Sequence, residues 1–163
     1  YNVSKGKGAV YVIYGNKKEN LPNIDLRTQV LDPMTTGFQI TTTTTINLGF
    51  AVAGAGDINH DGFDDMILGA YGNNGNAGAA YIVYGGLKTS MKNIDLANED
   101  LDPESTGFAI TGGVAEDRLG RSVSRAGDIN GDGYEDLMVA AYGRNNYQGA
   151  VYVIHSSKWY IEG

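Results

Sequence analysis

The sequence contains no cysteine, which excludes disulfides, thiolate nucleophiles and cysteine-zinc sites. Basic residues are few: 12 lysines and arginines stand against 19 aspartates and glutamates. The resulting net charge of −7 argues against nucleic acid as a partner and against charge-driven binding to anionic lipid. Apolar runs are all shorter than the roughly 18 residues that a membrane-spanning helix needs, so no membrane insertion is predicted.

Catalytic motifs are also missing. The sequence has no G-x-S-x-G and no histidine pair at zinc spacing, and its two histidines fall at a variable loop position (His60) and at a strand position (His155). Glu116 and Asp117, in "VAEDR", are interpreted as a solvated turn rather than as an acid–base pair. We therefore predict a protein that is not an enzyme.

What the sequence does contain is a repeat. "GAVYVIYG" begins at Gly8, "GAAYIVYG" at Gly78 and "GAVYVIHS" at Gly149, at intervals of 70 and 71 residues. "NIDL" at Asn23 returns at Asn93, and "TGFQI" is answered 70 residues later by "TGFAI". Self-similarity at one fixed period is the signature of a repeat architecture.

Each repeat reads as four short strands. They are "FAVAG" or "RSVSR", then "MILGAY" or "LMVAAY", then the Gly-Ala-Val-Tyr run, and last "GFQI" or "GFAI". Valine, isoleucine, threonine and the 11 tyrosines favour strands, and no segment has helical periodicity. Four strands covered on both faces make a propeller blade, so we predict an all-β chain of four-stranded antiparallel β-propeller blades.

The phase of the repeat divides the chain into three units. Residues 1–47 supply strands three and four of a first blade, residues 48–118 a complete blade, and residues 119–163 the first three strands of another. About 2.3 repeats cannot close a ring that takes roughly 4–8 blades, so the propeller is incomplete in this chain. We expect contacts at both ends, either with further repeats of a longer chain or with neighbouring copies.

An acidic loop occurs once in each of the last two units, "DINHDGFDD" at 57–65 and "DINGDGYED" at 128–136. Oxygen-bearing side chains stand at positions 1, 3, 5 and 9, with glycine at 6, a spacing that suits Ca²⁺ with its six to eight oxygen ligands. The predicted ligands are Asp57, Asn59, Asp61, Asp65 and the carbonyl of Phe63, and in the second loop Asp128, Asn130, Asp132, Asp136 and the carbonyl of Tyr134.

Two other kinds of loop share part of this pattern. An EF-hand needs glutamate at position 12, where this chain has Leu68 and Val139, and it needs helices where this chain predicts strands. A plain hairpin turn with acidic residues for solubility is the other. Three carboxylates gathered in each loop would repel one another without a cation, so we predict two Ca²⁺ sites with Asp65 and Asp136 closing the shells.

The stretches "LGFAVAGAGDINHDGFDDMILGAY" and "LGRSVSRAGDINGDGYEDLMVAAY" resemble FG-GAP repeats, the blades of integrin α-subunit propellers. Leucine replaces the phenylalanine of Phe-Gly at Leu48 and Leu119, and tyrosine replaces the proline of Gly-Ala-Pro at Tyr71 and Tyr142. The resemblance implies a propeller, usually seven-bladed, with Ca²⁺ between its first and second strands and an extracellular setting.

The functional prediction is a calcium-stabilised extracellular or cell-surface segment that acts in adhesion, protein interaction or assembly. The alternative is an accessory module of a secreted hydrolase or lyase, with carbohydrate as its ligand. Trp159, interpreted as covering an edge rather than stacking on a sugar, and the glycosylation sequon at Asn2 complete the candidate features.

Overall fold

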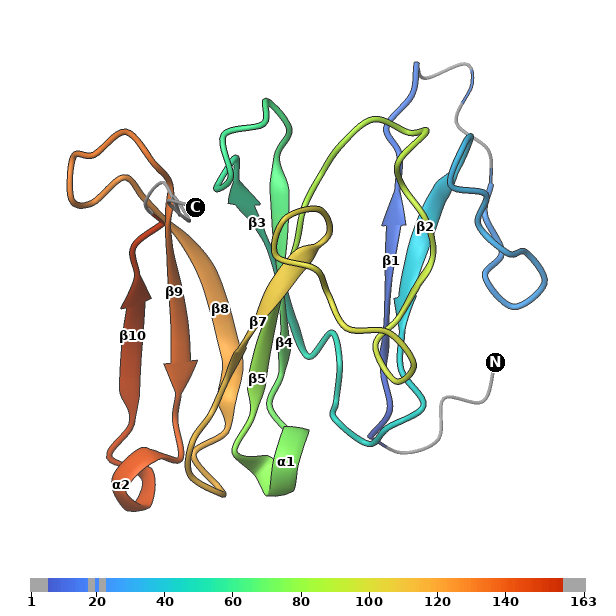
Figure 1. Cartoon of the computed structure of the whole chain (residues 1–163). Helices are drawn as coiled ribbons and strands as arrows, with labels where there is room; N and C mark the ends of the chain where they lie inside the picture. The colour runs from blue at the N-terminus through green and yellow to red at the C-terminus, as the bar shows by residue number, and fades with distance from the viewer. Residues whose placement is uncertain (1–5, 18–19, 21–22, 157–163) are drawn as a thin grey trace.

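The computed structural model describes residues 6–17, 20 and 23–156 and forms three β-sheets that stand side by side (Figure 1). The strands are β1 (Ala9–Ile13), β2 (Gly37–Thr41), β3 (Ala51–Gly56), β4 (Asp65–Ala70), β5 (Ala79–Val83), β6 (Ile94–Asp95), β7 (Gly107–Thr111), β8 (Leu119–Gly127), β9 (Asp136–Ala141) and β10 (Ala150–Ile154). Two one-turn helices are α1 (Asn73–Asn76) and α2 (Arg144–Tyr147). The all-β prediction is confirmed.

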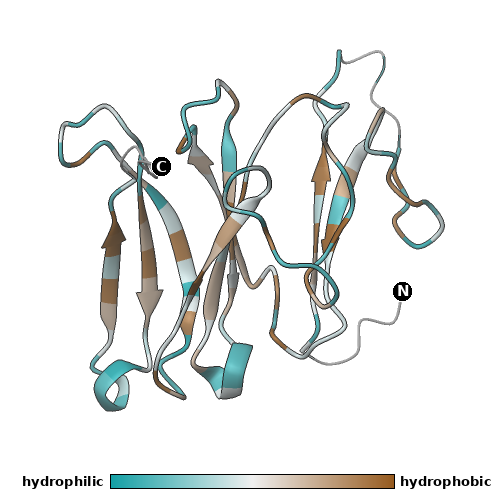
Figure 2. Ribbon diagram, viewed as in Figure 1, coloured by the Kyte–Doolittle hydropathy of each residue, from teal (hydrophilic) through white to brown (hydrophobic). Residues whose placement is uncertain are grey.

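The central sheet is a complete blade, with four antiparallel strands in the order β3-β4-β5-β7. Its four strands coincide with the four predicted for the middle repeat. Strand β5 has all but one of its residues buried, because it is flanked by strands on both edges and by side chains on both faces. Apolar residues lie mainly in the strands and polar residues mainly in the connections (Figure 2).

The two flanking sheets have three strands each, ordered β10-β9-β8 on one side and β1-β2-β6 on the other. Strand β6 was not predicted: it comes from the connection between β5 and β7 of the central blade and pairs in parallel with β2 of the neighbouring sheet. Every other ladder is antiparallel. The predicted division at 1–47, 48–118 and 119–163 stays a prediction, and Asn2 and Trp159 lie outside the described residues.

Two hydrophobic cores fill the spaces between the sheets. One joins the central sheet to the β8–β10 sheet through Ile67, Ile82 and Val139, and the other joins it to the β1–β2 sheet through residues such as Leu68 and Phe38. Successive residues of a strand point to opposite faces, so β4 sends Ile67 into one core and Leu68 into the other. The central sheet is therefore held from both sides.

Short parallel bridges tie each sheet to the next at equivalent positions. Gly8 pairs with Leu48 and Gly78 with Leu119. The one-turn helices lie at this same end of the sheets, and each contains two residues in the left-handed region, such as Asn74 and Asn145. Both acidic loops project from the opposite end (Figure 1). The fold thus presents the two candidate sites side by side on one rim.

Candidate metal centres in the acidic loops

Each acidic loop connects the first strand of a unit to the second. Strand β3 ends at Gly56, where φ is +74°, and β4 begins at Asp65; β8 ends at Gly127, with φ of +79°, and β9 begins at Asp136. A register shift precedes each loop, so the chain leaves the ladder with one residue unpaired. Asp65 and Asp136, at position 9 of the loops, are thus also the first residues of β4 and β9.

Backbone hydrogen bonds fold the first loop around Asp57. The amide of Asp61 donates to Asp57 Oδ1 at 3.0 Å and to Asn59 Oδ1 at 3.1 Å, and the amide of Gly62 donates to Asp57 Oδ2 at 3.0 Å. Gly62 has φ of +91°, which places it at the sharp turn. Three of the predicted ligands are thus held on one side of a tight turn.

The second loop repeats this geometry. Gly133 donates its amide to Asp128 Oδ2 at 2.9 Å, and the amide of Asp132 donates to Asp128 Oδ1 at 3.1 Å and to Asn130 Oδ1 at 3.0 Å. Gly131 adds a further bond to Asp128 Oδ1 at 2.7 Å. The same side chains make the same bonds in loops 71 residues apart, so the local sequence determines the loop conformation.

Asp65 anchors the first loop to the sheet. Its side chain is buried, and its two oxygens accept the amides of Ile58 at 2.9 Å and Gly85 at 2.8 Å. Burial raises the pKa of Asp65 to about 6, opposed by these two hydrogen bonds and assisted by the nearby carboxylates of Asp61 and Asp57. The raised pKa marks a carboxylate whose negative charge lacks compensation from the protein alone.

Asp136, the equivalent residue of the second loop, is fully buried and less well satisfied. Its Oδ2 accepts the amide of Ile129 at 2.9 Å and lies 3.3 Å from His155 Nδ1. Its Oδ1 has no hydrogen-bond partner among the described residues. An unpartnered buried carboxylate oxygen is rare in folded proteins and fits a position where a cation binds.

The chemistry of the donors fits Ca²⁺, although the loops do not form a finished cage. Among the described residues, no three aspartate, glutamate, histidine or cysteine side chains gather closely enough to hold an ion by themselves. Ca²⁺ takes carbonyl and amide oxygens as readily as carboxylates. The residues that would hold it are Asp57, Asn59, Asp61, Asp65 and Phe63 in one loop, and Asp128, Asn130, Asp132, Asp136 and Tyr134 in the other.

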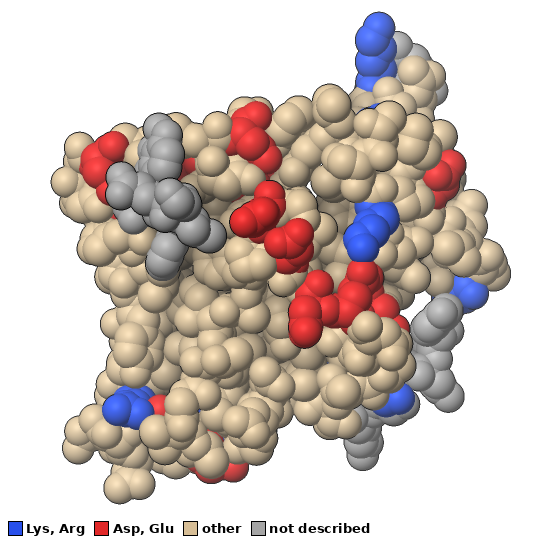
Figure 3. All heavy atoms as spheres, viewed as in Figure 1, with Lys and Arg blue, Asp and Glu red and all other residues tan. Residues whose placement is uncertain are grey.

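The two loops contact each other through their position-4 and position-7 side chains. His60, which is exposed as its variable loop position predicts, stacks on the Tyr134 ring with centroids 4.2 Å apart. Acidic side chains occupy the upper rim and the middle of the face shown in Figure 3, and basic ones are few there. The candidate sites therefore lie next to each other on an acidic rim.

The interpretation of "VAEDR" as a solvated turn is correct for Glu116 and wrong for Asp117. Glu116 is exposed and pairs with Arg118 at 2.9 Å, whereas Asp117 is buried and pairs with Arg144 at 2.7 Å. The partner Arg144 comes from α2, 27 residues further along the chain, and no local pattern indicates it.

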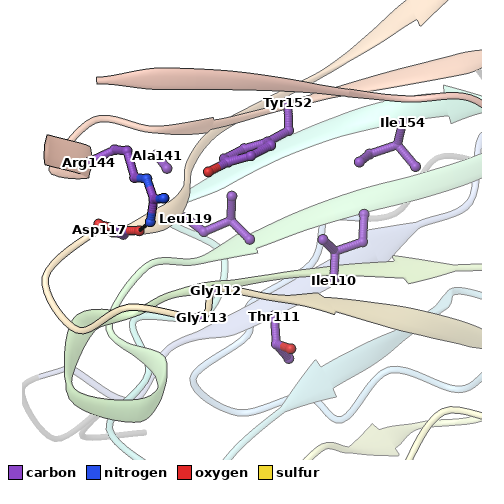
Figure 4. Close-up of a pocket in the computed structure, with 10 residues that line it drawn as sticks. All are labelled: Ile110, Thr111, Gly112, Gly113, Asp117, Leu119, Ala141, Arg144, Tyr152 and Ile154. Carbon is purple, nitrogen blue, oxygen red and sulfur yellow. Dashed lines mark hydrogen bonds and ion pairs between the residues drawn. The ribbon is translucent and has the colours of Figure 1, made fainter. Parts of the chain in front are cut away.

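This ion pair closes one end of a pocket of about 230 Å³ between β7 and β10 (Figure 4). The walls include the apolar side chains of Ile110 and Ile154 and the ring of Tyr152. Asp117 and Arg144 neutralise each other, and the lining holds no serine, histidine or second free carboxylate. The pocket therefore presents no acid–base pair for hydrolysis.

A cluster of aromatic rings around Arg121 was missed by sequence reasoning. The Arg121 guanidinium lies 3.8 Å from the centroid of the Phe50 ring, 5.0 Å from Tyr71 and 5.5 Å from Tyr142. Phe50 and Arg121 are equivalent positions of the two repeats, so one supplies a ring and the other a cation. In the sequence, the only sign of this contact is that the aligned positions hold phenylalanine in one repeat and arginine in the next.

Comparison with known proteins gives the family. A family model described as "FG-GAP repeat" matches residues 48–83 and 119–154, and both matches span an acidic loop and the three strands around it. The chain contains FG-GAP repeats at these two positions. The substitutions at Leu48 and Leu119 therefore leave the FG-GAP pattern recognisable, as the resemblance implied.

Relatives of two kinds share this FG-GAP segment. "Integrin alpha pat-2" of Caenorhabditis elegans is 38% identical over 114 residues, covering 63% of this chain and 9% of the relative. "Integrin alpha-2" of Bos taurus is 35% identical over 96 residues, covering 59% and 8%. "Phosphatidylinositol-glycan-specific phospholipase D" of Bos taurus is 38% identical over 119 residues, covering 68% and 13%. The chain thus corresponds to a small part of each relative.

Among the described residues, neither helix reaches the length and apolar character that a membrane crossing requires.

Proposed function

We propose that this chain is a calcium-stabilised segment of an extracellular or cell-surface protein and that it works through protein interaction. Integrin-type FG-GAP repeats support the interaction role. The observation that carries the calcium part is the buried Asp136 Oδ1, which has no hydrogen-bond partner within the described part of the chain and lies beside a loop whose other oxygens are held on one side of a turn.

The proposed contribution of the chain is to order the oxygen donors before the ion arrives. Asp57 and Asp128 are each fixed by amides from positions 5 and 6 of their own loops. Burying the negative charge of Asp65 or Asp136 is unfavourable, and bound Ca²⁺ would supply a positive charge beside it. Because only the folded chain orders these donors, the ion stabilises the folded state by mass action.

Thermal unfolding with and without a chelator tests this proposal. We expect calcium to raise the melting temperature of the native chain by several degrees, because each 1 kcal/mol of stabilisation shifts it by roughly 2–4 °C in a chain of this length. The double variant Asp57→Ala, Asp128→Ala is expected to lose that response. The matched control Asp100→Ala, Glu104→Ala removes the same charge from exposed positions outside the loops and is expected to keep it.

Equal melting of the native chain in calcium and in chelator would refute the calcium proposal. Loss of the response in the control variant would show that overall charge, and not the loops, is responsible.

A second candidate function is favoured by the similarity to phosphatidylinositol-glycan-specific phospholipase D. In that case the segment is an accessory module of a secreted enzyme, with carbohydrate as a candidate ligand. The two candidates differ in what accompanies the segment in the full-length protein: further repeats favour the interaction role, and a catalytic domain favours the accessory role. Sequencing the complete transcript distinguishes them.

A further inference from the structure

A surface of arginines and aromatic rings lies at the end of the sheets opposite the acidic loops, where β3 and β8 begin and β4 and β9 end (Figure 1). Three of its rings are open to water, since Phe50 is 51% exposed, Tyr142 36% and Tyr147 62%. Each ring has its centroid between 3.8 and 5.6 Å from a guanidinium carbon. This arginine–aromatic surface consists of Phe50, Tyr71, Arg118, Arg121, Tyr142 and Tyr147.

Arg121 is the cation of this surface whose charge is not compensated. The two carboxylates at this end of the sheets are already paired, Glu116 with Arg118 at 2.9 Å and Asp117 with Arg144 at 2.7 Å. Within the described part of the chain, Arg121 forms no ion pair and its guanidinium donates no hydrogen bond. A positive charge therefore remains available here in a chain whose net charge is −7.

The contact with Phe50 orients Arg121 without using its hydrogen-bond donors. The guanidinium carbon lies 3.8 Å from the centroid of the Phe50 ring, and Tyr71 and Tyr142 flank it at 5.0 and 5.5 Å. Aromatic rings attract a cation but offer it no oxygen acceptor. The planar fork of N–H groups thus stays free for a carboxylate, which it matches with two parallel hydrogen bonds.

Two other members of the surface occupy backbone positions that disfavour them. Arg118 has φ of +57° and Tyr147 has φ of +66°, in the left-handed region. The aligned positions of the middle repeat have nearly the same φ but hold Asn47 and Asn76, and asparagine tolerates this conformation better than arginine or tyrosine. The last unit keeps the less favourable residues, which indicates that their side chains have a role beyond the fold.

We propose that the arginine–aromatic surface binds an acidic segment of a partner protein. A partner aspartate or glutamate carboxylate accepts hydrogen bonds from Arg121, and the apolar residue beside it covers the exposed rings of Phe50 and Tyr142. Charge complementarity selects this occupant, because the one uncompensated group is a cation and the acidic loops lie at the other end of the sheets. Arginine and tyrosine are also the residues enriched at the energetic centres of interfaces. This inference names the partner chemistry for the proposed interaction role and rests on that proposal.

Two end-blocked peptides test the requirement for a carboxylate. They are acetyl-Gly-Phe-Asp-Phe-Gly-amide and the matched peptide with asparagine in place of aspartate. Each is titrated in calcium into ¹⁵N-labelled chain while the Nε–Hε signal of Arg121 and the amide of Tyr142 are followed. We expect the aspartate peptide to shift both signals to saturation and the asparagine peptide to bind at least about tenfold more weakly, because a charge-assisted pair is lost.

Substitutions in the chain locate the contact. Arg121→Gln keeps a polar side chain of similar reach but removes the charge, and it is expected to weaken the aspartate peptide at least about tenfold. Arg125→Gln is the matched control on the same strand, because Arg125 pairs with Glu135 and lies outside the surface, and it is expected to bind like the native chain. If Arg121→Gln does not fold, Tyr147→Asn replaces it: this variant receives the residue of the aligned repeat and is expected to bind several-fold more weakly.

The proposal is wrong if millimolar aspartate peptide leaves the Arg121 signal unmoved, if the asparagine peptide binds equally well, or if the substitutions within the surface leave the affinity unchanged. Melting of the same samples with and without calcium separates this result from the proposed function. Failure of peptide binding with calcium-dependent melting intact removes the acidic partner alone, whereas loss of both removes the calcium proposal as well.

Discussion

At the scale of single residues, the two acidic loops differ in how their position-9 carboxylates are satisfied. Asp65 accepts two amides, one of them from Gly85 beyond the end of β5. At the corresponding position of the second loop, Ser156 instead donates its hydroxyl to the carbonyl of Glu135, and one oxygen of Asp136 finds no partner in residues 6–17, 20 and 23–156. The first carboxylate is therefore held by two backbone amides, and the second by one amide and by His155 Nδ1 at 3.3 Å.

The titration of Asp65 without calcium is the first prediction at this scale. Its pKa in the folded chain is raised to about 6, above the ordinary value of 3.8, so folding favours the protonated form. The contribution of Asp65 to the free energy of unfolding is therefore fully present below about pH 4 and is lost as pH rises through 6. Calcium favours the ionised form and is expected to lower this pKa.

Carboxyl ¹³C chemical shifts of Asp65, followed against pH in chelator and in calcium, measure this pKa directly. The prediction fails if the carboxyl titrates near 3.8 in the calcium-free chain.

At the scale of elements, the strands followed from the sequence because each repeat shows the same four apolar runs between glycine-rich turns. Strand β6 did not, since a two-residue pairing has no periodicity and depends on a neighbouring sheet that local pattern does not specify. The candidate loop ligands could be predicted from the sequence because their spacing is local, and they stay a prediction. The Asp117–Arg144 pair and the Arg121 cluster were not, because both join residues through tertiary packing.

Glycine at the start of β8 is predicted to be essential for the approach of one sheet to the next. Gly120 has φ of +81°, and a Cβ there would overlap the carbonyl oxygen of Ala79 in β5. We expect Gly120→Ala to lower the free energy of unfolding by about 3 kcal/mol or more, because backbone strain and overpacking add. Urea denaturation in calcium measures the change.

Gly131 provides the matched control. It also has a positive φ, of +76°, but a Cβ there would meet nothing within 4 Å. The equivalent position of the first loop holds His60 with φ of +61°, so a side chain is accepted in this conformation. Gly131→Ala is expected to cost only about 1 kcal/mol. Equal losses for the two substitutions would show that the left-handed conformation alone, and not close sheet contact, explains the requirement for glycine.

At the scale of the whole molecule, the three sheets form a linear array, with one hydrophobic core between each pair of adjacent sheets. The central sheet contributes to both cores, with Ile82 on one face of β5 and Val83 on the other. The outer strands are less covered: β10 leaves Val151 64% exposed, and no residue of β1 is fully buried. Stability in such arrays is a sum of repeat and nearest-neighbour terms, so it is expected to be highest in the centre.

Native-state hydrogen exchange in calcium is therefore predicted to show a gradient across the array. The amides of β4 and β5 exchange slowest, because both strands are paired on both edges and covered on both faces. The amides of β1 and β10 exchange at least about tenfold faster, since each strand is paired on one edge only and its side chains remain partly open to water.

Loss of calcium is expected to accelerate exchange in β9 and β10 before β1, because the second acidic loop leads directly into β9 whereas β1 adjoins neither loop. Uniform protection of all ten strands would contradict this prediction and would mean that the three sheets unfold as one cooperative unit.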